Sequence, residues 1–270
     1  LEEQGYSVTR LAPAPSGEIP TEAVLEALRS DTILVSLMLV NNETGSVTDI
    51  AAIAAGLRQA GSSALLHTDA VQGFLKVPCR PGELGVDLMS ISSHKIHGPK
   101  GAGALYIRQG LQLPPLILGG GQEAERRAGT EALPAIAGFG LAASLGAADF
   151  PASVTRMAEL RRQIIETLAA ALPELQVNGG GAPHLLNLSL PGHRSEVLLN
   201  WLDAQGVCVA RSSACKKGRR SHVLEAMGLP ATVIDGSIRV SLSRYTTAEE
   251  AKAFCQLLIQ GAGSLRRSVR

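Results

Sequence analysis

Two short apolar runs between residues 64 and 95 each end in polar side chains, and this repeated pattern limits the fold more than any other feature of the chain. Residues 64–66 (Ala-Leu-Leu) lead to Asp69, and residues 88–91 (Leu-Met-Ser-Ile) lead to a Ser-Ser-His-Lys segment that ends at Lys95. Runs of this length are typical of buried parallel strands. Open α/β sheets bind ligands just past the carboxyl ends of such strands, so we expect Asp69 and Lys95 to face one ligand site.

The rest of the chain alternates between helical and strand patterns. We expect helices over 21–30, 49–61, 134–148, 151–171, 195–205, 221–227 and 247–265, and strands over 33–40, 103–108, 184–190, 207–211 and 238–242. Such alternation favours an α/β fold with a mostly parallel sheet and right-handed crossovers. A break near Asp149 predicts two domains, a larger one over 1–148 and a smaller one over 149–270.

Composition excludes several classes of protein. The chain has 270 residues, of which 45% are hydrophobic and 3% aromatic, and its formal net charge is +1, so it offers no overall field for a nucleic acid or a membrane. No apolar run is long enough to span a bilayer, and we expect no signal peptide. The four cysteines have no CxxC or zinc-finger spacing, and the histidines have no metal-like spacing. These features predict a soluble protein of the cytoplasm without a metal site.

Lys95 and Asp69 are chemically suited to act together. A lysine can form a Schiff base with an aldehyde cofactor, and an aspartate on a neighbouring strand can keep a ring nitrogen protonated. The alternative is that both are solvated strand-end charges of little energetic consequence. Gln72, close after Asp69, and His94, next to Lys95, favour the cofactor interpretation.

The two segments also carry a family resemblance. Residues 67–72 read HTDAVQ and residues 92–106 read SSHKIHGPKGAGALY. These patterns resemble those of the cysteine desulfurases, which are pyridoxal-phosphate enzymes of the class V aminotransferase group. The resemblance implies the PLP-dependent transferase fold type I, with a PLP-binding large domain over 1–148 and a small C-terminal domain over 149–270. It also implies that a family segment preceding Leu1, with a threonine-containing phosphate loop and a histidine that stacks on the cofactor, is missing from this sequence.

The resemblance assigns roles to five residues of the two segments. Lys95 would bind the cofactor covalently, and Asp69 would pair with its ring nitrogen. Gln72 would hydrogen-bond the ring hydroxyl, and Ser92 and His94 would contact the phosphate.

Cys215 matches the family's catalytic cysteine. In the family that residue takes the sulfur of cofactor-bound L-cysteine as a persulfide and leaves L-alanine. Positive charge favours the reactive thiolate, and several basic residues surround Cys215: Lys216, Lys217, Arg219 and Arg220. The alternative, an inert buried cysteine, is what we expect for Cys79 and Cys255, and Cys208 is expected in the core. One departure from the family pattern is Ser212, where a glycine is usual.

Three further residues match the family. Arg239 would hold the substrate carboxylate bidentately, and is preferred over Arg244 because it lies on the strand rather than past its end. Asn42 would lie beside cofactor and substrate, although an Asn-Asn-Glu-Thr-Gly segment can also be a simple turn. Thr130 would reach the cofactor phosphate of a partner subunit, which requires a homodimer, although its surroundings also suit a glycine-rich surface turn.

Taken together, the sequence predicts a cysteine desulfurase that converts L-cysteine to L-alanine and a Cys215 persulfide. The basic loop around Cys215 would dock a sulfur acceptor or an iron–sulfur scaffold protein, for iron–sulfur cluster or thiocofactor assembly. We expect no direct binding of a nucleic acid. Two alternatives stay open: another class V enzyme, either an aminotransferase or a selenocysteine lyase, and a catalytically incomplete chain that serves as a binding module.

Overall fold

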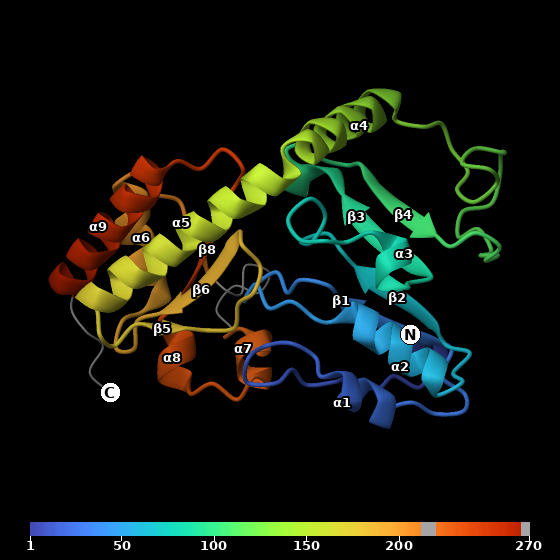
Figure 1. Cartoon of the computed structure of the whole chain (residues 1–270), viewed down its shortest axis with the longest axis horizontal. Helices are drawn as coiled ribbons and strands as arrows, with labels where there is room; N and C mark the ends of the chain where they lie inside the picture. The colour runs from blue at the N-terminus through green and yellow to red at the C-terminus, as the bar shows by residue number, and fades with distance from the viewer. Residues whose placement is uncertain (212–219, 266–270) are drawn as a thin grey trace. The chain divides into compact units, whose positions relative to one another are not determined.

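The computed structural model describes residues 1–211 and 220–265, which form two compact units (Figure 1). The first unit comprises Leu1–Leu28, Val40–Asp49 and Pro151–Arg270, and the second comprises Arg29–Leu39 and Ile50–Phe150. Both units are therefore built from segments that are distant in sequence. The predicted functional division into 1–148 and 149–270 is a different kind of boundary and stays a prediction.

The second unit is built on a four-stranded sheet in the order β1-β2-β3-β4. The first three strands are parallel, and the fourth runs antiparallel to β3. Their bounds are β1 Leu34–Met38, β2 Leu65–Asp69, β3 Leu88–Ser92 and β4 Gly103–Ile107. The expected strands and their mostly parallel pairing are confirmed, so β2 and β3 end at the same edge of the sheet.

Helices connect and cover these strands. In α2 (Ile50–Gln59) the buried residues Ile50, Ile53, Ala54 and Leu57 share one face, as the spacing of an amphipathic helix requires. The other helical segments are the short α3 (Pro81–Leu84), the single 3₁₀ turn η2 (Ser93–Ile96) and α4 (Leu133–Ala148). The α3 helix was not expected, because four residues carry too little periodicity to detect.

The first unit contains a second four-stranded sheet, in the order β5-β6-β8-β7, in which every pairing is antiparallel. Its strands are β5 Gln176–Val177, β6 Leu185–Ser189, β7 Ala210–Arg211 and β8 Ser237–Ser241. Its helices are η1 Glu2–Gln4, α1 Thr21–Glu26, α5 Phe150–Ala171, α6 Ser195–Ala204, α7 His222–Ala226, α8 Ala231–Asp235 and α9 Ala248–Ser264.

The core of the first unit lies between this sheet and helices α5, α6 and α9. Leu186 and Leu188 of β6 and Ile238 of β8 belong to one cluster with buried helical residues. These helical residues include Ile164, Leu168, Leu198, Leu202 and Leu258. This packing fixes β8, and with it Arg239, inside a well-supported layer.

Among the described helices, no single one is long and apolar enough to cross a membrane. The helices α4 and α5 have sufficient length and apolar composition only when they are counted together across the break between them.

Candidate active site

The carboxyl edge of the second unit's sheet holds the first group of candidate residues. Asp69 is the last residue of β2, and Ser92 is the last residue of β3, whose Ser90 is paired with Asp69. The Asp69 side chain is fixed by its own turn, because Oδ1 accepts a hydrogen bond from the Val71 main-chain N–H at 2.9 Å. A carboxylate held in this way has a second oxygen with which to meet a cationic ring nitrogen.

His67, two residues before Asp69 on β2, contacts side chains of both neighbouring strands. Its Nδ1 lies 2.8 Å from the Ser36 hydroxyl of β1, and its Nε2 lies 2.9 Å from the Ser90 hydroxyl of β3. Burial lowers the pKa of His67, and the nearby Asp69 opposes this by raising it. The ring therefore spans three strands and supports the strand end that carries Asp69.

Lys95 sits on η2, the turn of helix that directly follows β3, and its side chain is half-buried. Ser92 Oγ and His94 Nδ1 lie 2.7 Å apart, so these two predicted phosphate contacts are neighbours. The chain then turns back, since Gly98 N–H donates to the Ser93 carbonyl at 3.1 Å. A Cβ at Gly98 would collide with Ser93 Oγ, which explains why a glycine stands there.

The sequence analysis missed Lys76, which lies in the turn after β2. Its Nζ donates a hydrogen bond to the main-chain carbonyl of Lys95 at 2.5 Å. Burial, and then repulsion from Lys95, lower the pKa of Lys76 to about 8. The signal in the sequence was a lysine inside the otherwise apolar stretch Phe74–Val77.

The first unit brings together the two candidate substrate residues. Arg239 on β8 donates from Nη1 to the main-chain carbonyl of Asn42 at 3.0 Å. Asn42 lies in a turn fixed by the Asn41 side chain, whose Oδ1 accepts from the Glu43 N–H at 2.9 Å. The Arg239 Nε is buried and has no hydrogen-bond partner in the described part of the chain. The guanidinium therefore retains a donor for a further acceptor such as a carboxylate.

Glu43 and Ser221 form a second contact that sequence reasoning missed. The buried Glu43 carboxylate accepts a hydrogen bond from the Ser221 hydroxyl, which caps α7 by accepting from Leu224 N–H at 3.2 Å. Burial raises the pKa of Glu43, and Ser221, His222 and Arg239 oppose that rise. The pair anchors the chain just after the segment that carries Cys215.

Several candidates stand apart from these two groups. Cys215, with Ser212, Lys216, Lys217 and Arg219, lies outside the described residues, while Arg220 forms an ion pair with Asp235 at 2.7 Å. Thr130 is exposed in the loop before α4, and the neighbouring Gly129 N–H donates to Gln122 Oε1 at 3.2 Å within that loop. Gln72 is buried in the turn after Asp69.

The remaining cysteines differ from one another. Cys255 is buried, and burial raises its pKa to about 11, while burial also raises the pKa of Cys79. Both shifts disfavour the thiolate, in agreement with the inert role expected for these two residues. The expectation that Cys208 belongs to the core is wrong, because Cys208 is exposed and its Sγ donates to Asp203 at 3.6 Å. It lies in the loop that leads to the edge strand β7, where an apolar run does not ensure burial.

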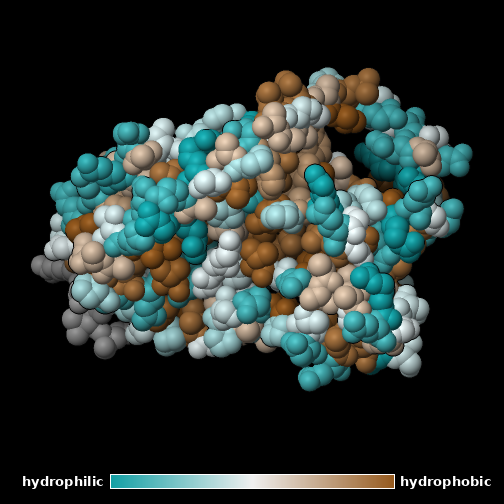
Figure 2. Space-filling view, viewed as in Figure 1, coloured by the Kyte–Doolittle hydropathy of each residue, from teal (hydrophilic) through white to brown (hydrophobic). Residues whose placement is uncertain are grey.

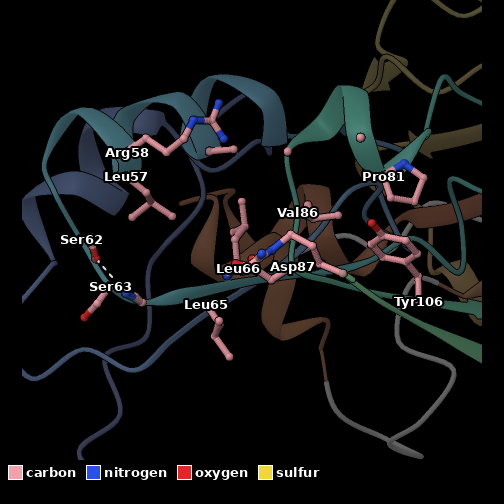
Figure 3. Close-up of a pocket in the computed structure, with 15 residues that line it drawn as sticks. Leu57, Arg58, Ser62, Ser63, Leu65, Leu66, Pro81, Val86, Asp87 and Tyr106 are labelled. Carbon is pink, nitrogen blue, oxygen red and sulfur yellow. Dashed lines mark hydrogen bonds and ion pairs between the residues drawn. The ribbon is translucent and has the colours of Figure 1, made fainter. Parts of the chain in front are cut away.

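A pocket of about 510 Å³ lies at the opposite edge of the second unit's sheet, beside α2 and α3 (Figure 3). Asp87 lies within it and binds the Leu66 N–H at 2.8 Å and the Arg108 Nε at 2.6 Å. It is also lined by Arg58, Arg108, Tyr106 and two serines, Ser62 and Ser63. Asp87 and Arg108 are engaged with each other, so the candidate chemistry stays at the carboxyl edge, where Asp69 and Lys95 lie.

The residues of that edge fit an aromatic aldehyde that carries a phosphate. They provide a half-buried lysine, a fixed carboxylate at the neighbouring strand end, a buried glutamine, and an adjacent hydroxyl and imidazole. No group of three or more histidine, cysteine, aspartate or glutamate side chains suited to a metal occurs in the described residues.

The family of the chain follows from comparison with known proteins. A family model described as Aminotransferase class-V matches residues 1–254, and the chain belongs to this family. Within it the chain groups with the cysteine desulfurases. It is 44% identical to cysteine desulfurase 2 of Trichormus variabilis, over 96% of this chain and 65% of that protein. It is 40% identical to a cysteine desulfurase of Nostoc, over 98% of this chain and 67% of that protein. The chain thus spans about two thirds of the length of these relatives.

Solved structures agree with this grouping. A NifS-like protein matches with a TM-score of 0.90 at 32% identity, over 98% of this chain and 70% of that one. A protein called SspA, solved in complex with cysteine, matches with a TM-score of 0.75 at 32% identity, over 91% and 69%. The resemblance to the cysteine desulfurases and the fold-type-I architecture are confirmed, and so is pyridoxal phosphate as the cofactor of the family.

Proposed function

We propose that this chain carries the cysteine desulfurase reaction, in which L-cysteine gives L-alanine and a persulfide on Cys215. The main support is that Asp69 and Lys95 stand at neighbouring strand ends on one edge of a parallel sheet, in a chain 44% identical to a cysteine desulfurase. That the related SspA was solved with cysteine supports the choice of substrate.

Each candidate residue has a defined task in this reaction. When bound, pyridoxal phosphate supplies an aldehyde that condenses with amines and a ring that accepts electrons. The Lys95 amine binds the cofactor and moves protons at the substrate. The Asp69 carboxylate keeps positive charge at the ring nitrogen, while Gln72, Ser92 and His94 orient the ring hydroxyl and the phosphate.

The substrate is held and cleaved by residues of the first unit. Arg239 binds the carboxylate of L-cysteine, and Asn42, which it contacts, orients cofactor and substrate. The Cys215 thiolate attacks the substrate sulfur: an S–S bond forms, the Cβ–S bond breaks, and Cβ takes up a proton to give L-alanine. The substrate thiol and the Cys215 thiol together thus become one persulfide, and no external oxidant is needed.

A homodimer is part of the proposal. The α4 helix exposes large apolar side chains, and Figure 2 shows apolar surface gathered over it. These side chains are Leu133, Ile136, Leu141 and Leu145, and Leu116 and Leu118 of the preceding loop are also exposed. A second copy would cover such a surface and place Thr130 at the partner's cofactor phosphate.

We also propose the cellular setting of the reaction. The PLP-binding part would comprise 1–148, and the part with the cysteine loop would comprise 149–270, in a protein of the cytoplasm. The basic residues around Cys215 suit an acidic sulfur acceptor, such as an iron–sulfur scaffold protein.

The proposal is tested with purified protein, pyridoxal phosphate, L-cysteine and dithiothreitol. We expect L-alanine and sulfide in equal amounts, loss of both in Cys215→Ala and Lys95→Ala, and loss of the visible cofactor band in Lys95→Ala only. Matched controls are Cys208→Ala and Lys100→Ala, which alter exposed residues outside the proposed site. Full sulfide release by Cys215→Ala would contradict the mechanism.

A further inference from the structure

Asn187 is a buried asparagine on β6 that lies directly opposite Arg239 of the neighbouring strand β8. Residues opposite each other in an antiparallel pair project from the same face of the sheet, with Cβ atoms about 5 Å apart. Both side chains donate hydrogen bonds to consecutive main-chain carbonyls of one segment. Arg239 Nη1 donates to the Asn42 carbonyl at 3.0 Å, and Asn187 Nδ2 donates to the Glu43 carbonyl at 3.1 Å. The sheet thus holds residues 42–43 at two adjacent points.

The orientation of the Asn187 amide is fixed by a neighbour. Its Oδ1 accepts a hydrogen bond from Asn178 Nδ2 at 2.7 Å, and the same Nδ2 donates to the Ser189 hydroxyl at 2.7 Å. All three side chains are buried. Because the amide oxygen of Asn187 faces a donor, its amide nitrogen faces the Glu43 carbonyl. Turning the amide over would leave buried groups unpaired, so Asn187 is a rigid support for residues 42–43.

The supported segment packs closely against the strand that carries Asn187. Gly45 has a φ of +73°, and a Cβ added there would lie 2.9 Å from the side chain of Leu185, the first residue of β6. The main chain of the turn therefore rests directly on β6. With so little space for movement, the donors of Asn187 and Arg239 set the position of residues 42–43 on the sheet.

The charge of Arg239 is the second reason to consider Asn187. In the described part of the chain Arg239 Nε is buried without a hydrogen-bond partner. The Glu43 carboxylate, whose pKa Arg239 lowers, is already bound to the Ser221 hydroxyl. Asn187 presents an uncharged side chain opposite the arginine, where a carboxylate would pair with the guanidinium.

We propose that Asn187 is a positioning residue for the substrate carboxylate. Its amide holds residues 42–43 on the sheet, where Arg239 contacts them with one nitrogen and retains its other donors for the carboxylate of L-cysteine. As an uncharged side chain, Asn187 also leaves the charge of Arg239 to that carboxylate. This inference rests on the proposed role of Arg239.

The test compares a ligand that has a carboxylate with one that lacks it. The chain loaded with pyridoxal phosphate is titrated with L-alanine or with ethylamine, and the change in the visible cofactor band gives each dissociation constant. Asn187→Asp keeps the acceptor for Asn178 but loses the donor and adds a charge, whereas Asn187→Ala loses the amide without adding a charge. Ser189→Ala is the matched control, because it removes one hydrogen bond to Asn178 and leaves the donor to Glu43 in place.

The carboxylate should decide which ligand loses affinity. We expect L-alanine to bind Asn187→Asp at least about tenfold more weakly, because a new carboxylate opposite Arg239 competes with that of the ligand. Asn187→Ala should bind L-alanine at least about threefold more weakly, a modest effect that one lost hydrogen bond explains. Ethylamine should bind every variant like the original chain, and Ser189→Ala should bind both ligands like the original chain.

Equal losses for L-alanine and ethylamine in Asn187→Asp would overturn the proposal, and so would unchanged binding of L-alanine. If Asn187→Asp does not fold, the same comparison in Asn187→Ala decides.

A second arm needs no cofactor. Phenylglyoxal labels arginine guanidinium groups, and peptide mass spectrometry compares Arg239 with the exposed Arg58 in the same sample. We expect labelling of Arg239 to slow at least about threefold in Asn187→Asp, where a carboxylate pairs with the guanidinium, and to stay unchanged in Ser189→Ala. Unchanged labelling in Asn187→Asp would refute the influence of Asn187 on Arg239.

An original chain that binds L-alanine no more tightly than Arg239→Gln would instead refute the proposed role of Arg239. The labelling arm would still report on Asn187 in that case, so the two failures are distinguishable.

Discussion

Lys76 in the second unit and Glu43 in the first are ionisable side chains with shifted pKa values beside proposed site residues, and the two differ in their surroundings. In the second unit Lys76 contacts the main chain of Lys95, and burial and a like charge lower its pKa to about 8. In the first unit Glu43 is 5% exposed and accepts a hydrogen bond from Ser221. Burial raises the pKa of Glu43, but its neighbours oppose the rise.

The difference indicates what each side chain contributes. Glu43 has partners that stabilise its charge, as expected of a group that holds structure together. Lys76 has a neighbour that destabilises its charge, so its position costs stability. Substitutions in the two units should therefore separate effects on reaction steps from effects on folding.

The largest effect is expected from Asp69→Asn, which preserves the shape of the side chain. The amide would still accept from the Val71 N–H but would lose the charge that the proposed function places beside the ring nitrogen. We expect kcat for alanine formation to fall by on the order of 100-fold, the usual size of a lost electrostatic contact at a reacting centre. Stability should change little, and a fall in activity of less than about tenfold would contradict the role of Asp69.

The second prediction concerns the pH dependence of folding stability. The pKa of Lys76 is lowered to about 8 in the folded chain, from an ordinary value near 10.5. Between these values the unfolded chain binds more protons, so the free energy of unfolding should rise with pH, and the cost is fully present below pH 8. Compared with Lys76→Met, the original chain should gain up to about 3 kcal/mol from pH 8 to pH 10.5.

Urea unfolding of both chains across this range measures the difference, and subtraction removes the titration of groups that the two chains share. Parallel curves for the two chains would show that Lys76 is not destabilised by its surroundings. The contrast with Glu43 would then disappear.

The sequence predicted most helices and strands of both units, although not the short β5 and α8, and it did not predict the contacts between side chains. The strands that end at Asp69 and Ser92 were found because buried parallel strands leave a clear apolar run followed by polar residues. Asn42 and Arg239 were each assigned to the substrate only through a resemblance, and their contact was not predicted, because 197 positions separate them and no local pattern records their hydrogen bond.

The sequence analysis missed Lys76 and Glu43 for the same physical reason. Lys76 and Glu43 act through long-range contacts with Lys95 and Ser221, and the burial that shifts their pKa values depends on tertiary packing. Cys208 shows the opposite error, since an apolar local sequence suggested burial and the structure places it at an edge. Local sequence therefore identified the ends of the strands, and packing determined which charges matter there.

The third prediction tests the substrate half. Arg239→Lys retains the charge but loses the planar fork that can bind a carboxylate while holding the Asn42 carbonyl. We expect KM for L-cysteine to rise roughly tenfold with a smaller change in kcat, because ground-state binding is lost. Arg244→Lys is the matched control, since that guanidinium contacts Tyr245 instead. Equal effects of the two substitutions would argue against a specific role for Arg239.

The smallest effect is expected from Glu43→Gln, which keeps an acceptor for the Ser221 hydroxyl. Because the pKa of Glu43 is raised in the folded chain, its carboxyl stabilises the fold at low pH, and that contribution is lost as the pH rises through the raised value. The glutamine variant does not titrate, so its stability should change less between pH 4.5, the ordinary carboxyl value, and pH 7, and should differ from the original by about 1 kcal/mol or less at pH 7. Urea unfolding at the two pH values measures this. A loss of stability several times larger, with reduced activity and a pH dependence like that of the original, would mean that the Glu43 charge itself supports Arg239, and the contrast between a purely structural Glu43 and Lys76 would fail.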